Sequence, residues 1–498
     1  MTGLNRYPNF VTTKGENPVF AIHNDNTLIT NMQRTMKSHL LYPLLSAALI
    51  LMAGMTHVAH GQDFNGSWSG VLEFGPSSYT IVFNIQQTGD DVAITWDFPD
   101  QNAFNLPATA TISGNELNVD MPGSNASYKG ILEGEALNGT FTQHGFDITL
   151  NMTRTGEVQD TRPQETAIET DTNKPYRSED VTFNNGDIIF SGTLTLPDKG
   201  RHFPAVVLVA GSGPLDRDEE AFGHKPFLLL ADALSRNGFA VLRYDERGVG
   251  ATIGGDPGAP SEPLATDAMA ALRYLKTRPE VDATRVGFVG HSEGGLIAVM
   301  NAAKHPDEVA YIVSLAGPGV PGKELGMTQT QLGFKAAGLE FGEDLMKMNE
   351  DFYTIIATER DSVTMCNKLT EYFHQQQGNP ALQQYLKGVP TAQYIKLFAL
   401  PMVRCVFQYD PTENLKRVKC PMLAINGMLD CQVACENNLD GIKRHVPHAT
   451  VKAYEGLNHF FQTCSEWKGS ANYSAIHETM SPVVLQDIVT WLQSTVKQ

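Results

Sequence analysis

The stretch from Val286 to Met300 constrains the fold of this 498-residue chain more than any other feature. It opens with an apolar, β-prone run that ends at Val289, and it closes with helix-forming residues from Leu296 onward. Between them stands the pattern Gly-x-Ser-x-Gly, centred on Ser292. Glycines on both sides let chain segments pass closely, so the sequence predicts a sharp strand-to-helix turn with an exposed serine hydroxyl. The N–H groups and dipole at the start of the helix would favour negative charge there.

Strand-like and helix-like runs alternate around this stretch, from residue 181 to the end of the chain. Strands are expected at 181–183, 188–196, 205–210, 240–244, 286–289, 309–315, 422–425 and 451–454, and helices at 227–237, 266–276, 296–304 and 481–496. This alternation predicts a mostly parallel sheet with helices on both faces. Residues 321–419 interrupt it with a helical segment rich in Met, Phe, Tyr and Leu, which we expect to form a cap over the site.

An acid and a histidine follow Ser292 at the places where a nucleophilic serine would need them. A serine hydroxyl requires a base at neutral pH, and that base requires an acid that fixes its tautomer. Asp430 comes just past the buried strand at 422–425, and His459 is the first histidine after the last strand. Both loops leave the carboxyl ends of strands, at the same edge as Ser292. We therefore predict Ser292, Asp430 and His459 as a catalytic triad, in the chain order Ser–acid–His.

Other acids and histidines fit these roles less well. Three further acids are expected in a turn or in a helix: Asp410, Glu436 and Asp440. Two histidines precede the last strand and would face the opposite edge: His445 and His448. His291 adjoins Ser292, but neighbouring side chains on such a turn point apart, so we interpret it as a packing residue.

An oxyanion hole would need two N–H donors. We expect one from the backbone of Glu293 and the other from Ser212, in the Gly-Ser-Gly-Pro turn after the strand at 205–210. The Glu293 carboxylate is expected to cap its helix. Residues 216–218 (Asp-Arg-Asp) are expected to pair internally and brace the loop rather than bind substrate, and residues 244–248 to form a structural turn.

Five motifs together resemble a bacterial α/β-hydrolase family, whose members are described as carboxylesterases or serine aminopeptidase-like proteins. They occur in order within residues 181–498: Gly-Ser-Gly-Pro with Asp-Arg-Asp (211–218), Tyr-Asp-x-Arg-Gly (244–248), Gly-His-Ser-Glu-Gly-Gly (290–295), Asn-Gly-x-x-Asp-x-Gln-Val (426–433) and Gly-Leu-Asn-His (456–459). The resemblance implies the α/β-hydrolase fold and the same triad. One departure is Cys431 beside the acid with Cys435 nearby, which leaves open whether a disulfide shapes that loop.

The chain before this domain divides into three segments. Residues 1–35 are polar and patternless, whereas residues 36–61 have a basic start, an apolar middle and a small-residue ending, as in a secretory signal. We expect residues 1–35 to be a spurious extension and the mature chain to begin near Gln62, in the periplasm or outside the cell. A membrane anchor is the alternative for the apolar stretch at 40–58.

Short alternating runs separated by turn formers predict a small antiparallel sandwich or barrel at 62–156. This domain also resembles one often found ahead of such hydrolases. Its aromatic residues Trp68, Trp96 and Tyr128 could stack on a sugar, although aromatic side chains at strand positions favour the core. A polar linker is expected at 157–178, followed by the hydrolase domain at 179–498 with its cap at about 321–419.

The net charge of −18 argues against nucleic acid or an anionic membrane surface as a partner. Six cysteines permit disulfides, but none completes a zinc-binding pattern, so we expect neither a metal nor a cofactor. The sequence thus predicts an exported serine hydrolase that acts on a small ester through an acyl-enzyme and does not insert stably in a membrane. The alternatives are an aminopeptidase acting on short peptides and a glycan-binding protein with a vestigial site; the oligomeric state stays open.

Overall fold

The computed structural model describes residues 63–496 except 75–76, 89–90, 99–102, 122–125, 144–145, 156–162, 387–388, 466–472 and 474–475. The predicted extension at 1–35 and the predicted signal at 36–61 lie outside the described residues. Among the helices of the described part, none is both long enough and apolar enough to cross a membrane.

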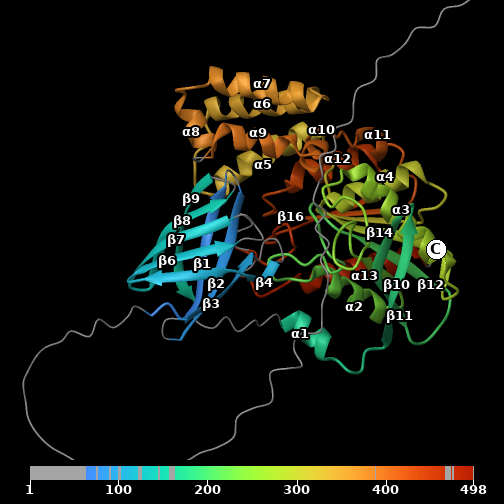
Figure 1. Ribbon diagram of the computed structural model, residues 1–498. Coiled ribbons are helices and arrows are strands. Elements are labelled where there is room, and N and C mark those ends of the chain that lie inside the picture. Colours follow the sequence, from blue (N-terminus) through green and yellow to red (C-terminus); the bar gives the residue numbers. More distant parts are fainter. Residues whose placement is uncertain are drawn as a thin grey trace, which may run out of the picture. The chain divides into compact units, whose positions relative to one another are not determined.

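Nine strands form the first domain as a single antiparallel sheet (Figure 1). They are β1 (Gly66–Phe74), β2 (Ser77–Thr88), β3 (Asp91–Phe98), β4 (Ala103–Pro107), β5 (Thr109–Ser113), β6 (Glu116–Met121), β7 (Ala126–Glu133), β8 (Ala136–Gln143) and β9 (Phe146–Thr155). Their order is β4-β3-β2-β1-β9-β8-β7-β6-β5. Because β3 also contacts β5, the sheet curls toward a barrel and does not split into the two layers of a sandwich.

The interior of this domain is filled by aromatic and aliphatic side chains. Trp68, Trp96 and Tyr128 are all buried, and the Trp68 indole donates a hydrogen bond to the Phe64 carbonyl. The Tyr128 ring crosses two strands that lack side chains at this point: a Cβ on Gly139 would come within 2.5 Å of the phenol oxygen. The three rings are therefore core residues, in agreement with the packing interpretation.

Eight strands form the sheet of the second domain. They are β10 (Tyr176–Asn185), β11 (Ile188–Pro197), β12 (Phe203–Val209), β13 (Ala240–Tyr244), β14 (Val281–His291), β15 (Ile312–Leu315), β16 (Met422–Gly427) and β17 (Thr450–Tyr454), in the order β10-β11-β13-β12-β14-β15-β16-β17. β10 pairs antiparallel with β11, and β11 with β13, while the remaining pairs are parallel. This is the predicted α/β-hydrolase fold, in which the parallel strands present their carboxyl ends at one edge.

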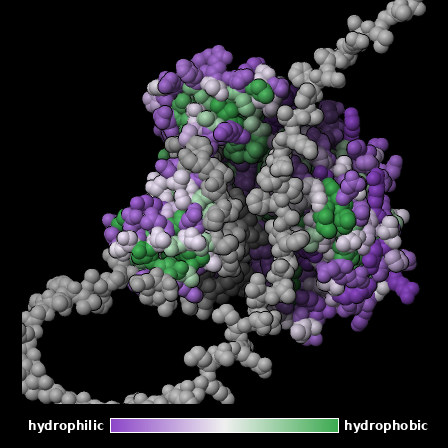
Figure 2. Space-filling view, in the orientation of Figure 1, coloured by the Kyte–Doolittle hydropathy of each residue, from purple (hydrophilic) through white to green (hydrophobic). Residues whose placement is uncertain are grey.

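Helices cover both faces of this sheet and create two cores. One core includes side chains of α3 (Ser261–Thr277), α4 (Glu293–Lys304) and α12 (Cys435–His445), and the other those of α2 (Pro226–Arg236) and α13 (Pro482–Val496). Successive residues of the central strand β12 alternate between the two cores, as the side chains of a strand buried on both faces must. On the face drawn in Figure 2, hydrophilic side chains cover most of this domain.

Helices also form in the predicted linker and in the predicted cap. Helix α1 (Pro163–Thr170) lies within the predicted linker, and its Ile168 joins the core beneath α2 and α13. The cap consists of α5 (Gly322–Ala336), α6 (Glu343–Thr358), α7 (Ser362–Gln375), α8 (Pro380–Leu386), α9 (Thr391–Ala399), α10 (Pro401–Gln408) and α11 (Thr412–Leu415) (Figure 1). An aromatic cluster around the fully buried Phe352 gives the cap its own core.

Candidate active site

Ser292 lies on the predicted turn between β14 and α4, in a strained backbone conformation. Its φ is 51° and its ψ is −119°, a region that a residue with a side chain seldom adopts. The turn leaves no room for side chains beside it, since a Cβ on Gly290 would lie 2.1 Å from the Gly294 carbonyl oxygen. A Cβ on Gly294 would in turn lie 2.0 Å from the carbonyl oxygen of Val209. Both glycines of the pattern are thus required by the close packing of strand and helix.

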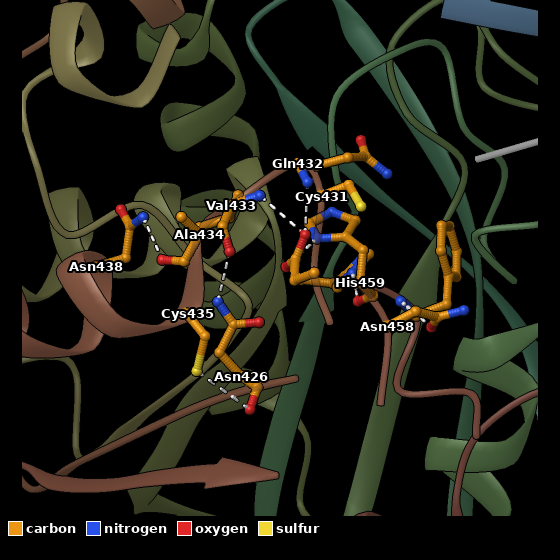
Figure 3. A network of polar contacts seen from close by, with 12 residues as sticks. Asn426, Cys431, Gln432, Val433, Ala434, Cys435, Asn438, Asn458 and His459 are labelled. Atoms are coloured by element: carbon orange, nitrogen blue, oxygen red, sulfur yellow. Dashed lines mark hydrogen bonds and ion pairs between the residues drawn. The ribbon is translucent and has the colours of Figure 1, made fainter. Parts of the chain in front are cut away.

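Asp430 and His459 form a buried hydrogen-bonded pair. Figure 3 shows His459 beside the residues that follow Asp430 in its loop. His459 Nδ1 lies 2.7 Å from Asp430 Oδ2, and the two residues are 2% and 0% exposed. The other carboxylate oxygen, Oδ1, accepts the amides of Gln432 at 2.7 Å and Val433 at 2.9 Å. The carboxylate is therefore fixed by its own loop and can orient the imidazole through Nδ1.

Two buried asparagines, to which we assigned no role from the sequence, shape the loops that carry this pair. Asn458 Oδ1 accepts the amides of Phe460 and Gln462, each at 3.0 Å, and so folds the turn that presents His459. Asn426 Nδ2 donates to the Val433 carbonyl at 2.8 Å across the acid loop (Figure 3). Both belong to motifs of the family resemblance, which was the available signal, and Asn426 also lies at the end of a buried strand.

Ser292 adjoins a residue whose ring packs against the ring of His459. The ring of His291, one residue before Ser292, lies 4.7 Å from the ring of His459, centroid to centroid. Within the described residues, no hydrogen bond joins the Ser292 hydroxyl to His459. In serine hydrolases without substrate this bond is often long and tightens on binding. The structure thus joins Asp430 to His459 and packs the residue before Ser292 against the His459 ring.

The loop after β12 passes close to Ser292, as an oxyanion hole requires. A Cβ on Gly211 would lie 3.3 Å from the Ser292 Cβ, so Gly211 and the following Ser212 border the nucleophile. In the part of the chain that the structure describes, the backbone amides of Ser212 and Glu293 donate no hydrogen bond. The expected role of these two N–H groups as an oxyanion hole stays a prediction.

The prediction that the Glu293 carboxylate caps α4 is wrong. The N-cap of that helix has no side-chain hydrogen bond; instead Glu293 accepts hydrogen bonds from the Ser212 hydroxyl at 2.6 Å and from the Ser261 hydroxyl. Burial raises the pKa of Glu293, and these two hydroxyls oppose that rise. The side chain points between the loop after β12, where Ser212 donates to it, and the start of α3, where Ser261 donates to it, and so it ties the two segments together.

The internal pairing expected for residues 216–218 is also wrong. Arg217 binds Asp245 through two bonds of 2.9 and 2.7 Å, and Asp218 pairs with Arg243. Adjacent side chains in a tight turn point apart, whereas β13 and the residues after it offer partners across the sheet edge. Residues 216–218 therefore brace the loop after β12, as predicted, but through contacts with Arg243 and Asp245. The turn at 244–248 has a structural role, also as predicted.

The rival acids and histidines lie elsewhere. Asp410 accepts the Thr412 amide in an exposed turn, and two more acids are exposed on α12: Glu436 and Asp440. His448 bonds the Cys420 carbonyl before β17, and His445 ends α12. His291 is more than a packing residue, because both of its ring nitrogens make hydrogen bonds.

Among the residues that the structure describes, the cysteines form no disulfide, so none shapes the acid loop. Cys431 and Cys435 are buried, and burial raises the pKa of each thiol to about 12. Among the described residues, no three His, Cys, Asp or Glu side chains gather in a way that could hold a metal ion.

Comparisons with known proteins also point to the α/β-hydrolases. The sheet order and the serine turn are those of the α/β-hydrolase fold, and residues 225–463 match the family model described as serine aminopeptidase, S33. The chain is 27% identical over 286 residues to an esterase, EstD, of Thermotoga maritima, which covers 57% of this chain and 60% of that protein. It is 44% identical over 128 residues to an uncharacterized protein of Mycobacterium tuberculosis, covering 26% of this chain and 42% of that one.

Less than two thirds of either relative is therefore covered. Among solved structures, an α/β-hydrolase from Penicillium, GrgF, is 15% identical with a TM-score of 0.40, covering 65% of this chain and 100% of that one. The match at 225–463 and the esterase relative confirm the predicted resemblance to the family of carboxylesterases and serine aminopeptidase-like proteins, and they support a hydrolase.

Proposed function

We propose that this protein is a serine hydrolase that cleaves carboxylic esters through an acyl-enzyme on Ser292. The observation that carries the proposal is the buried Asp430–His459 pair beside the strained serine turn. A buried carboxylate on Nδ1 of a histidine serves to orient the ring and to stabilise it when it takes a proton.

The geometry supports a two-step reaction. Ser292 Oγ attacks the ester carbonyl carbon and gives its proton to His459 Nε2, while Asp430 stabilises the resulting imidazolium. The oxyanion accepts hydrogen bonds from the amides of Ser212 and Glu293, each worth roughly 3–4 kcal/mol of barrier. The bond to the alcohol oxygen then breaks, and His459 protonates that oxygen. Water, deprotonated by His459, attacks the acyl-enzyme and releases the acid and Ser292.

Esters are favoured over peptides by the position of the acidic residues in the cap. An aminopeptidase needs carboxylates that point at the free amino group of its substrate. Four of the five candidates are exposed to solvent, and the fifth is half-buried and pairs with a lysine one turn away: Glu340, Glu343, Asp344, Glu350 and Asp351. The relative from Thermotoga is named an esterase, whereas the matching family model is named for an aminopeptidase, so the peptidase stays the second candidate.

A glycan-binding protein with a vestigial site is the least supported alternative. The three rings that could have stacked on a sugar lie in the core of the first domain. Part of the proposal is that the chain is exported by the segment at 36–61 and acts on a small molecule in the periplasm or outside the cell.

A comparison of short p-nitrophenyl esters with aminoacyl p-nitroanilides tests this proposal. The protein is expected to turn over the esters faster, and Ser292→Ala is expected to remove both activities. Faster turnover of the anilides would show a peptidase. Hydrolysis that survives in folded Ser292→Ala protein would show that the reaction occurs at another site.

A further inference from the structure

A second carboxylate–histidine pair lies beside the first, and the proposed reaction does not use it. Glu219 Oε1 lies 2.9 Å from His291 Nδ1, and the two residues are only 1% and 5% exposed. Burying a carboxylate is costly unless it makes strong contacts, so the pair needs an explanation.

The backbone at Glu219 is strained in a way that turns this carboxylate inward. Its φ is 51°, which is unfavourable for a residue with a side chain. The same atom that faces His291, Oε1, also accepts the Gly211 amide at 2.7 Å. The second oxygen, Oε2, is buried and has no hydrogen-bond partner among the described residues. Both contacts of the carboxylate therefore converge on one oxygen.

His291 links Glu219 to the loop that carries His459. Its Nε2 lies 3.1 Å from the backbone carbonyl oxygen of His459, which can only accept, so Nε2 carries a hydrogen. With Nδ1 against a carboxylate, both nitrogens face acceptors. Burial lowers the pKa of His291, but the charge and hydrogen bond of Glu219 and the bond to the His459 carbonyl outweigh it, and the net shift is upward. His291 is thus occupied on both sides and is not itself a base.

Three segments of the candidate site meet at this pair. Gly211 directly precedes Ser212, a proposed oxyanion donor, and His291 directly precedes Ser292. The third segment is the loop of His459 itself. We infer that Glu219, acting through His291, is a positioning residue that holds the oxyanion loop, the serine turn and the histidine loop in register. This inference rests on the proposed function.

Substitutions at Glu219 separate this role from a contribution to folding alone. Glu219→Ala removes the acceptor of the Gly211 amide and of His291, so kcat on an ester should fall about 100-fold, as for a misplaced oxyanion donor, with little change in KM. Glu219→Gln keeps a carbonyl oxygen for the Gly211 amide but removes the charge that holds the second proton on His291, so its turnover should lie between those of the wild type and Glu219→Ala.

A matched control is Asp267→Asn. Asp267 is also a buried carboxylate, 1% exposed, and it pairs with Arg247 away from the three segments. This variant should lose stability in a thermal melt followed by circular dichroism but keep its kcat. A Glu219→Ala protein with wild-type kcat, or an Asp267→Asn protein that loses as much kcat at equal stability, would overturn the inference.

Nitrogen NMR of ¹⁵N-histidine-labelled protein measures the effect of the Glu219–His291 contact without relying on turnover. His291 should be protonated at both ring nitrogens in the wild type, and Glu219→Ala should remove the Nδ1 proton and shift the His459 signals. Unchanged His459 signals would overturn the positioning role. If Ser292→Ala keeps its hydrolysis, the proposed function fails instead, and the NMR result alone decides the role of Glu219.

Discussion

Asp430 shows how single contacts define a chemical role. Its Oδ1 is held by the amides of Gln432 and Val433, so only Oδ2 is left for His459. Because a carboxylate oxygen can only accept, Nδ1 of His459 carries the hydrogen, and Nε2 is left to act as the base in the proposed reaction. The carboxylate therefore sets the tautomer as well as the orientation of the ring.

Replacement of Asp430 by asparagine should preserve the fold and abolish most of the turnover. The carbonyl of the new side chain can still accept the two loop amides, but its NH₂ group would then donate to His459 Nδ1 and favour the wrong tautomer. In a serine protease the same change costs about 10⁴-fold in kcat. Steady-state kinetics on a p-nitrophenyl ester, with circular dichroism on the same samples, measures the effect.

The controls for this prediction are the acids that the structure places elsewhere. Asp410→Asn and Asp440→Asn are exposed changes and should leave kcat within a small factor. Wild-type turnover by Asp430→Asn would mean that the acid lies elsewhere, and Glu436 would be tested next.

The meeting of Asp430 and His459 could be predicted from chain order, but contacts between more distant partners could not. Both residues lie in loops that follow parallel strands of one sheet, β16 and β17, so their meeting at one edge follows from the fold. The contact of Glu293 with Ser261 joins residues 32 positions apart, and that of Glu219 with His291 joins residues 72 apart. Nothing in the local sequence tells which way such a side chain turns, and the helix-cap prediction failed for this reason.

At the scale of elements, the strand–turn–helix around Ser292 is the most tightly determined unit. Its continuous apolar strand, its glycines and its helix formers all predict the same strand–turn–helix, and the structure follows this prediction closely. Two of the differences between the prediction and the observed elements have a visible cause. β14 begins at Val281, because Val281 pairs with Phe203 despite the polar residues between. Helix α1 forms within the predicted linker, where Pro163 opens it and buried Glu165 hydrogen-bonds Thr479.

A methyl group added to the serine turn should disrupt it. In Gly294→Ala the new Cβ would lie 2.0 Å from the Val209 carbonyl oxygen, so β12 or α4 must move. A displacement of about 1 Å at the nucleophile can cost 100-fold in rate, and we expect at least that loss of kcat on an ester.

Gly342→Ala provides the comparison. Gly342 is the N-cap of α6, its φ is −76°, and a Cβ there would meet nothing within 4 Å. This variant should keep its kcat and lose no more than about 1 kcal/mol of unfolding free energy. Equal activity of the Gly294 and Gly342 variants would contradict the close packing of the turn.

At the scale of the whole molecule, three parts each have their own hydrophobic core. The first domain, the α/β domain and the cap were all predicted in order along the chain, because their apolar periodicities differ: alternating, strand with helix, and helical. The choice between a barrel and a sandwich could not be predicted, since it depends on the pairing of β1 with β9 and the contact of β3 with β5. Such pairings join residues far apart in the chain and leave no local pattern.

The central claim is that Ser292 is a nucleophile activated by the Asp430–His459 pair. A fluorophosphonate probe, which reacts with activated serines, tests it directly when the labelled peptide is identified by mass spectrometry. The account predicts one adduct on Ser292 in the folded wild-type protein and strongly slowed labelling in Asp430→Asn. A folded protein that stays unlabelled, or an adduct on another residue, would contradict it.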